Sequence, residues 1–169
     1  MRYLIAFVLP LLCFVSYAQR KITPTDEFNI TGIVKRELTL NLKSLANFKQ
    51  DSIPDVVVRN KHSEQKVTVR GMKGILLKTI LDSAKILARP RDFGEIYIVL
   101  TASDGYKNIY SWNELFNNEA GNQVYLITEA EGKTLDEMTE RIVVISLSDI
   151  ALGSRNIKGL AKIEVKKLE

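Results

Sequence analysis

Alternation of apolar and polar residues with a period of two marks several half-buried strands along this chain. The predicted strands cover residues 27–34, 37–41, 55–59, 66–70, 96–100, 107–110, 123–128, 141–146 and 160–165. The first two could form a hairpin-like pair, and the third and fourth a second pair across the polar turn 60–65. Residues 96–100 are apolar at successive positions, which favours an interior strand covered on both faces.

Apolar residues three and four apart predict three helices. A short helix lies within residues 41–48, with Asn41 as its N-cap, and another at residues 112–116, where Ser111 and Glu114 have capping-box spacing. The longest spans residues 75–87 after a flexible segment, 71–74, and ends before Pro90. Its predicted apolar stripe consists of Leu77, Ile80, Leu81, Ala84 and Leu87.

Clusters of strands with two or three helices between them are typical of an α+β fold. The chain has no internal repeat, no low-complexity segment and no linker-like stretch that would divide it. We therefore expect a single domain, residues 19–169, with a mixed β-sheet and two or three packed helices. Residues 96–116 are its best-determined unit, because strand, turn, returning strand and capped helix follow one another there.

Residues 1–18 have the pattern of a secretory signal peptide. Arg2 precedes an apolar run at residues 3–15, and Ser16, Tyr17 and Ala18 form a small-residue cleavage pattern before Gln19. The run is shorter than the roughly 20 residues that a helix needs to cross a bilayer, so no membrane span is expected. A lipid anchor at Cys13 is the alternative, but a large leucine precedes this cysteine. These features predict a periplasmic or secreted protein.

Composition excludes several classes of function. The net charge is only +4, and acidic residues interrupt the basic ones, so no nucleic-acid surface is expected. Cys13 is the only cysteine, so the mature chain has no thiolate for catalysis, a disulfide or a metal. His62, the only histidine, lies in a polar turn, which favours an exposed residue over a metal ligand. No catalytic residue or metal ligand is assigned.

Five motifs occur in the same order as in the molybdopterin-binding domain of the sulfite oxidase type. They are residues 74–81, 102–106 (Ala-Ser-Asp-Gly-Tyr), 141–145 followed by Asp149, 153–158 (Gly-Ser-Arg-Asn-Ile-Lys) and 161–165. The chain resembles the small, secreted, stand-alone versions of that domain over roughly residues 28–167. The resemblance implies the fold of these oxidoreductases.

The chain departs from this family where the chemistry resides. Family members bind molybdenum through a cysteine thiolate and a pterin dithiolene, whereas the equivalent stretch, residues 56–60, contains no cysteine. The arginine, histidine and asparagine set that holds the pterin phosphate is not recognisable either. We therefore expect no cofactor, with molybdopterin as the alternative.

Three functions are compatible with these features. The first is a non-catalytic, exported binding or accessory module for an unknown protein partner or a small anionic ligand. The second is a protein that binds a pterin or another small anion, in a pocket formed by Asp104, Tyr106, Arg155 and Lys158. The third is an unrelated exported structural or hydrolytic domain, although a catalytic triad would depend on His62 alone. Whether the protein is an enzyme stays open, and the missing cysteine argues against it.

Three residues of the candidate pocket also have a structural explanation. Asp104 could accept hydrogen bonds from a ligand or cap its own turn. Tyr106 could form a pocket wall or bury its ring and keep its hydroxyl at the surface. Arg155 could bind an anion, since it lies in a long loop near Gly153, or form a salt bridge with Asp149.

Overall fold

The computed structural model of the protein describes residues 21–59, 66–150 and 152–169. The predicted signal peptide and the turn that carries His62 lie outside the described residues, so both interpretations stay predictions. Within the described ranges, no helix has the length and apolar character needed to cross a membrane.

The first sheet is mixed and has five strands, in the order β2-β1-β13-β7-β8. Its strands are β1 (Glu27–Gly32), β2 (Leu38–Asn41), β7 (Ile96–Ala102), β8 (Lys107–Ser111) and β13 (Leu160–Lys167). Strands β1 and β13 run parallel, and the other pairs are antiparallel. The predicted pairing of β1 with β2 is confirmed, and β7 lies between β13 and β8 as its apolar sequence indicated.

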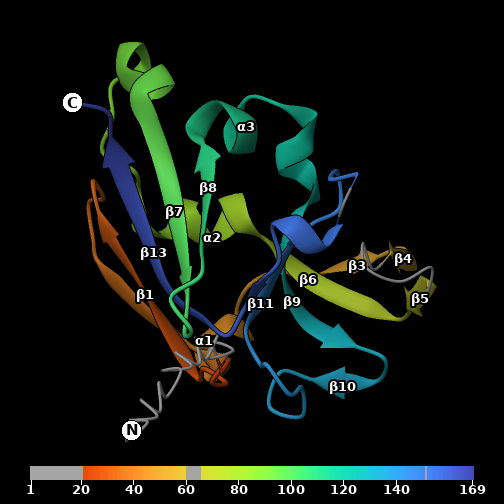
Figure 1. The fold of residues 1–169 in the computed structure, drawn as a ribbon. Coiled ribbons are helices and arrows are strands. Elements are labelled where there is room, and N and C mark those ends of the chain that lie inside the picture. The colour runs from red at the N-terminus through yellow and green to blue at the C-terminus, as the bar shows by residue number, and fades with distance from the viewer. Residues whose placement is uncertain (1–20, 60–65, 151) are drawn as a thin grey trace, which may run out of the picture.

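The second sheet is antiparallel, with the order β12-β11-β9-β6-β3 and the short β10 paired with β9. Its strands are β3 (Asp51–Ile53), β6 (Met72–Leu76), β9 (Val124–Ala130), β10 (Lys133–Thr134), β11 (Val143–Ser146) and β12 (Ile157–Lys158). The predicted pair β4 (Val56–Arg59) and β5 (Lys66–Val69) forms a separate antiparallel hairpin. Figure 1 shows this hairpin beside the second sheet, away from the first.

The helices are short and connect or separate the sheets. They are α1 (Leu42–Leu45), α2 (Leu77–Ala84), α3 (Trp112–Phe116) and the 3-10 helices η1 (Pro90–Glu95), η2 (Glu119–Gln123) and η3 (Leu152–Ser154). Helix α2 lies between the two sheets (Figure 1), and the side chains of Leu77, Ile80, Leu81 and Ala84 are fully buried there. The main core therefore fills the space between the sheets, around α2.

Asn41 caps α1 as predicted: its side-chain oxygen accepts a hydrogen bond from the Ser44 amide, and the Ser44 hydroxyl accepts one from the Asn41 amide. Ser111 also caps α3, through the Glu114 amide. The Glu114 carboxylate, however, does not complete a capping box and instead binds Arg155. Both caps confirm that short polar side chains at these positions set where the helices begin.

Residues 71–74 were predicted to be a flexible segment and 75–87 a helix. The first prediction was wrong, and the second was wrong about where the helix begins and ends. Met72–Leu76 is strand β6, which pairs with β3 and β9, and helix α2 begins only at Leu77. Gly74 lies within this strand. The residue is a glycine because a β-carbon there would lie 2.9 Å from the Leu126 carbonyl oxygen of β9. The helix ends at Ala84, before Lys85 with a φ of 56°, so Leu87 is 57% exposed and leaves the apolar stripe.

The mixed sheet, the antiparallel sheet and the few short helices confirm the predicted fold class. Three short strands, β3, β10 and β12, were not predicted either, because two or three residues are too few to display a period of two. A second, smaller apolar cluster lies on the outer face of the second sheet, around Ile53, Met72 and Ile127, with Val56 and Val69 of the hairpin packed against it.

Candidate functional site

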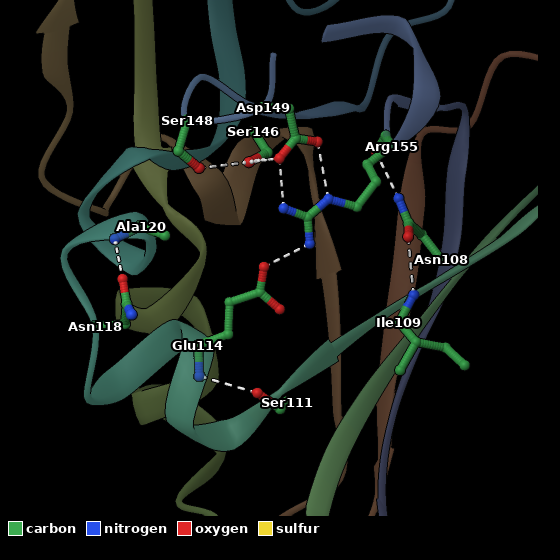
Figure 2. A network of polar contacts seen from close by, with 10 residues as sticks. All are labelled: Asn108, Ile109, Ser111, Glu114, Asn118, Ala120, Ser146, Ser148, Asp149 and Arg155. Carbon is green, nitrogen blue, oxygen red and sulfur yellow. Dashed lines mark hydrogen bonds and ion pairs between the residues drawn. The ribbon is translucent and has the colours of Figure 1, made fainter. Parts of the chain in front are cut away.

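Arg155 is the centre of a polar network between the two sheets (Figure 2). Its Nε donates a hydrogen bond of 2.8 Å to Oδ2 of Asp149, and its Nη2 donates to Oδ1 of the same carboxylate. Its Nη1 lies 2.5 Å from Oε1 of Glu114. The guanidinium also lies over the ring of Tyr110, with 4.6 Å between Cζ and the ring centroid. All three guanidinium nitrogens are therefore bonded to carboxylates, and the bidentate pair is the stronger geometry.

Neighbouring elements hold each partner of Arg155 in place. Ser146 at the end of β11 donates from its hydroxyl to Asp149 Oδ1 at 3.0 Å, and the Ser146 and Ser148 hydroxyls are 3.1 Å apart. On the other side, Asn108 of β8 donates from Nδ2 to the Arg155 carbonyl at 2.8 Å. The loop after β11 is thereby tied to both α3 and β8, as Figure 2 shows.

The charges of this network shift the pKa values of its members. Hydrogen bonds from Arg155 lower the pKa of Asp149 below its usual value near 3.8, and the Asp149 carboxylate raises the pKa of Arg155. Burial raises the pKa of Tyr110 to about 12. The Tyr110 hydroxyl is buried and has no hydrogen-bond partner in the described part of the chain. The charge of Arg155 is therefore already balanced by two carboxylates, which weakens it as an anion site.

We expect Asp149→Asn to lower the free energy of unfolding by about 1–2 kcal/mol at pH 7, because a charge-assisted bidentate contact is lost. The folded-state pKa of Asp149 is depressed, so its stabilisation is present above the unfolded value near 3.8 and is lost as the pH falls below it. The difference between parent and variant should therefore shrink below about pH 4. Urea unfolding at several pH values measures it.

The exposed Glu27→Gln is the control, expected to change the unfolding free energy by less than about 0.5 kcal/mol. A difference between parent and Asp149→Asn that stays constant from pH 7 to about pH 2 would contradict the assignment of this ion pair.

The other residues of the predicted ligand pocket have partners within the protein. Asp104 Oδ1 accepts from the Tyr106 amide at 2.8 Å, which caps the turn at Gly105. The Tyr106 hydroxyl donates to the Ser154 carbonyl at 2.7 Å, and Lys158 Nζ lies 2.7 Å from Glu140 Oε1. Tyr106 therefore contacts the loop that carries Arg155. Lys158 lies elsewhere and lines a cavity that neither of these residues lines. The role of these four residues in ligand binding stays a prediction.

That cavity lies on the outer face of the second sheet, beneath the β4–β5 hairpin, and has a volume of about 220 Å³. Most of its lining is apolar: Val56, Val69, Met72, Ile127, Ala130, Met138, Val143, Ile145 and Leu147. Its polar residues are Glu140, Asn156 and Lys158. The side chains of Lys158 and Glu140 are 47% and 32% exposed, which places their ion pair at the mouth.

Sequence reasoning missed this cavity because its walls come from strands that are far apart in the chain. One signal was present: β9 and β11 are apolar at consecutive positions, so each has an apolar side chain on both faces. Ile127 and Ile145 point to the outer face, and Leu126 and Val144 to the main core. Such strands require a second covering layer, which the hairpin supplies.

No group of three or more His, Cys, Asp or Glu side chains is placed to hold a metal ion in the described ranges 21–59, 66–150 and 152–169. The stretch that corresponds by resemblance to the metal-binding cysteine is β4, and Val56 of this strand lines the cavity. Among the described lining residues, the polar groups are therefore one amide and one ion pair.

The fold is similar to that of a solved molybdopterin oxidoreductase. The crystal structure of the sulfane dehydrogenase SoxCD from Paracoccus pantotrophus matches with a TM-score of 0.56 at 13% sequence identity. The match covers 85% of this chain but only 39% of the SoxCD chain, so this protein spans well under half of that chain's length. No protein-family model and no curated protein sequence matches. The resemblance is therefore one of fold, and it agrees with the fold expected from the sequence motifs.

Proposed function

We propose that this protein is a non-catalytic, exported binding or accessory module on the fold of a molybdopterin oxidoreductase. The observation that carries the proposal is the lining of the cavity beneath the β4–β5 hairpin. Of the twelve described residues that line it, nine are apolar, and the two charged ones form an ion pair with each other. Such a lining favours binding over acid–base or redox chemistry, which needs unpaired or perturbed titratable groups.

The residues at this site do not fit a molybdopterin. By resemblance, the metal would need a thiolate near β4, and Val56 offers only an aliphatic side chain. A pterin and its phosphate would need several hydrogen-bond donors and an uncommitted cation, but Lys158 is paired with Glu140, and Arg155 with Asp149 and Glu114. We derive no reaction step through this cofactor.

Export is the second part of the proposal, and its support is the signal-peptide pattern of residues 1–18. A mature chain that begins at Gln19 contains no cysteine, so it can fold in an oxidising compartment without disulfide chemistry. Mass spectrometry of protein from its natural host should find Gln19 as the first residue.

The decisive experiment is elemental analysis of the protein after expression in a host that makes the molybdenum cofactor. We expect no molybdenum and no oxidase activity towards sulfite or sulfoxides, because no thiolate is available to complete the metal's ligands. A molybdopterin oxidoreductase expressed in the same cells is the positive control.

A matched variant sharpens this test. Val56→Cys supplies a thiolate within residues 56–60, the stretch to which the family resemblance assigns the metal-binding cysteine. It should also purify without molybdenum, because the donors for the pterin are missing as well. Near-stoichiometric molybdenum in the parent protein would contradict the proposal. Molybdenum only in the variant would show that the cysteine alone was lacking.

A further inference from the structure

The described residues that line the cavity beneath the β4–β5 hairpin carry no net charge. Within the part of the chain that the structure describes, Lys158 and Glu140 are the only charged residues that line it, and their Nζ and Oε1 atoms are 2.7 Å apart. An ionic ligand would have to give up its hydration in an apolar space without an uncommitted counter-charge, which is far more costly than burying a neutral molecule. The lining therefore selects uncharged ligands.

Asn156 is the one uncharged polar residue among the described residues that line the cavity. Its Oδ1 is buried and accepts no hydrogen bond from any described residue. A buried acceptor without a partner is destabilising, so such atoms in native proteins are met by water or by a ligand. Arg155, the preceding residue, bonds to Glu114 of α3, whereas Asn156 lines the cavity. The two consecutive side chains thus serve separate sites.

From these observations we propose that the cavity binds a small, uncharged molecule with a ring-sized apolar body and one hydrogen-bond donor, which Asn156 Oδ1 accepts after its buried amide rotates towards the cavity. This inference rests on the proposed binding function and names its ligand class. The volume of about 220 Å³ sets the size of the body. An engineered cavity of roughly 150 Å³ holds benzene, which has six non-hydrogen atoms, so in proportion about nine fit here. The remaining atoms of a two-ring molecule would lie at the mouth, beside Lys158 and Glu140.

Three probes with one skeleton test the proposal by titration calorimetry at pH 7. 2-Naphthol is neutral and has a donor, 2-methoxynaphthalene lacks the donor, and 2-naphthoate is an anion. We expect 2-naphthol to bind with a dissociation constant of about 100 µM or tighter. Loss of one hydrogen bond should weaken 2-methoxynaphthalene about tenfold. The charge should weaken 2-naphthoate by about 100-fold or more.

Variants locate the site. Asn156→Leu keeps the side-chain volume but removes the acceptor, so it should erase the roughly tenfold preference for 2-naphthol over 2-methoxynaphthalene. Ala130→Phe should fill the cavity and weaken both probes by about tenfold or more. Ala46→Phe, the matched control, places the same ring at an exposed position outside this cavity and should leave both affinities unchanged.

The outcomes separate this inference from the function on which it rests. Equal affinity of the parent protein for 2-naphthol and 2-methoxynaphthalene, or no binding of any probe at roughly millimolar concentration, would overturn the inference. Preferential binding of 2-naphthoate that is lost in Lys158→Met would also overturn it, in favour of an anion site on the same module. Only the molybdenum measurement bears on the non-catalytic function, and the probe comparison in the parent protein needs no variant to fold.

Discussion

Replacing Gly32 with alanine is expected to lower the free energy of unfolding by more than about 4 kcal/mol, close to the whole stability of an ordinary domain. Gly32 ends β1 opposite Val165 of β13 and has a φ of +96°. A β-carbon there would lie 2.1 Å from the Val165 carbonyl oxygen. Backbone atoms cannot yield as a side chain does, so β1 would have to separate from β13.

Gly132→Ala is the matched control for this substitution. Gly132 also has a positive φ, of +74°, but no atom lies within 4 Å of its would-be β-carbon. Only left-handed backbone strain acts there, and the expected loss is about 1 kcal/mol. Guanidinium unfolding followed by far-ultraviolet circular dichroism measures both variants. Equal losses would show that the close approach of β1 to β13 is wrong.

Leu81→Ala is expected to lower the free energy of unfolding by about 2–5 kcal/mol, because it leaves a cavity between the two sheets. Leu81 is 0% exposed on α2 and belongs to the main core, together with residues of both sheets. The loss depends on how far the surrounding side chains can relax, and a helix enclosed by two sheets has little room to move.

Leu87→Ala provides the comparison, because the chemical change is identical and Leu87 is 57% exposed. We expect a change of less than about 0.5 kcal/mol. Urea unfolding of the two variants decides between the helix seen in the structure and the longer helix that the sequence pattern predicted. Similar losses at both positions would place Leu87 in the core after all.

Local chemistry explains what the sequence predicted correctly. The Asp104 turn, the Asn41 cap and the Ser111 cap each depend on residues within three positions of one another, and each forms as expected. The start of α2 depends instead on β9, a partner about 50 residues away. Ile75 is apolar and fits a helix or a strand equally, so only this pairing decides its state.

In the candidate site, too, contacts between residues close in sequence could be predicted and contacts between distant ones could not. Asp149, six residues from Arg155, was foreseen as its partner, whereas Glu114 could not be, because no local pattern connects α3 with the loop that carries Arg155. The cavity beneath the hairpin combines side chains from β4, β5, β6, β9 and β11. Sequence patterns indicated that these strands are apolar, but the space between them is a property of the assembled sheets.

The parallel pairing of β1 with β13 has a consequence for the time course of folding. Residue 29 of β1 pairs with residue 162 of β13. Strand β1 can therefore pair with β13 only after nearly all of the described chain has been synthesised. Contacts between such distant residues require the closure of a long loop before they contribute energy, which slows folding. The first sheet should therefore be completed only late in synthesis, when β13 becomes available to pair with β1 and β7.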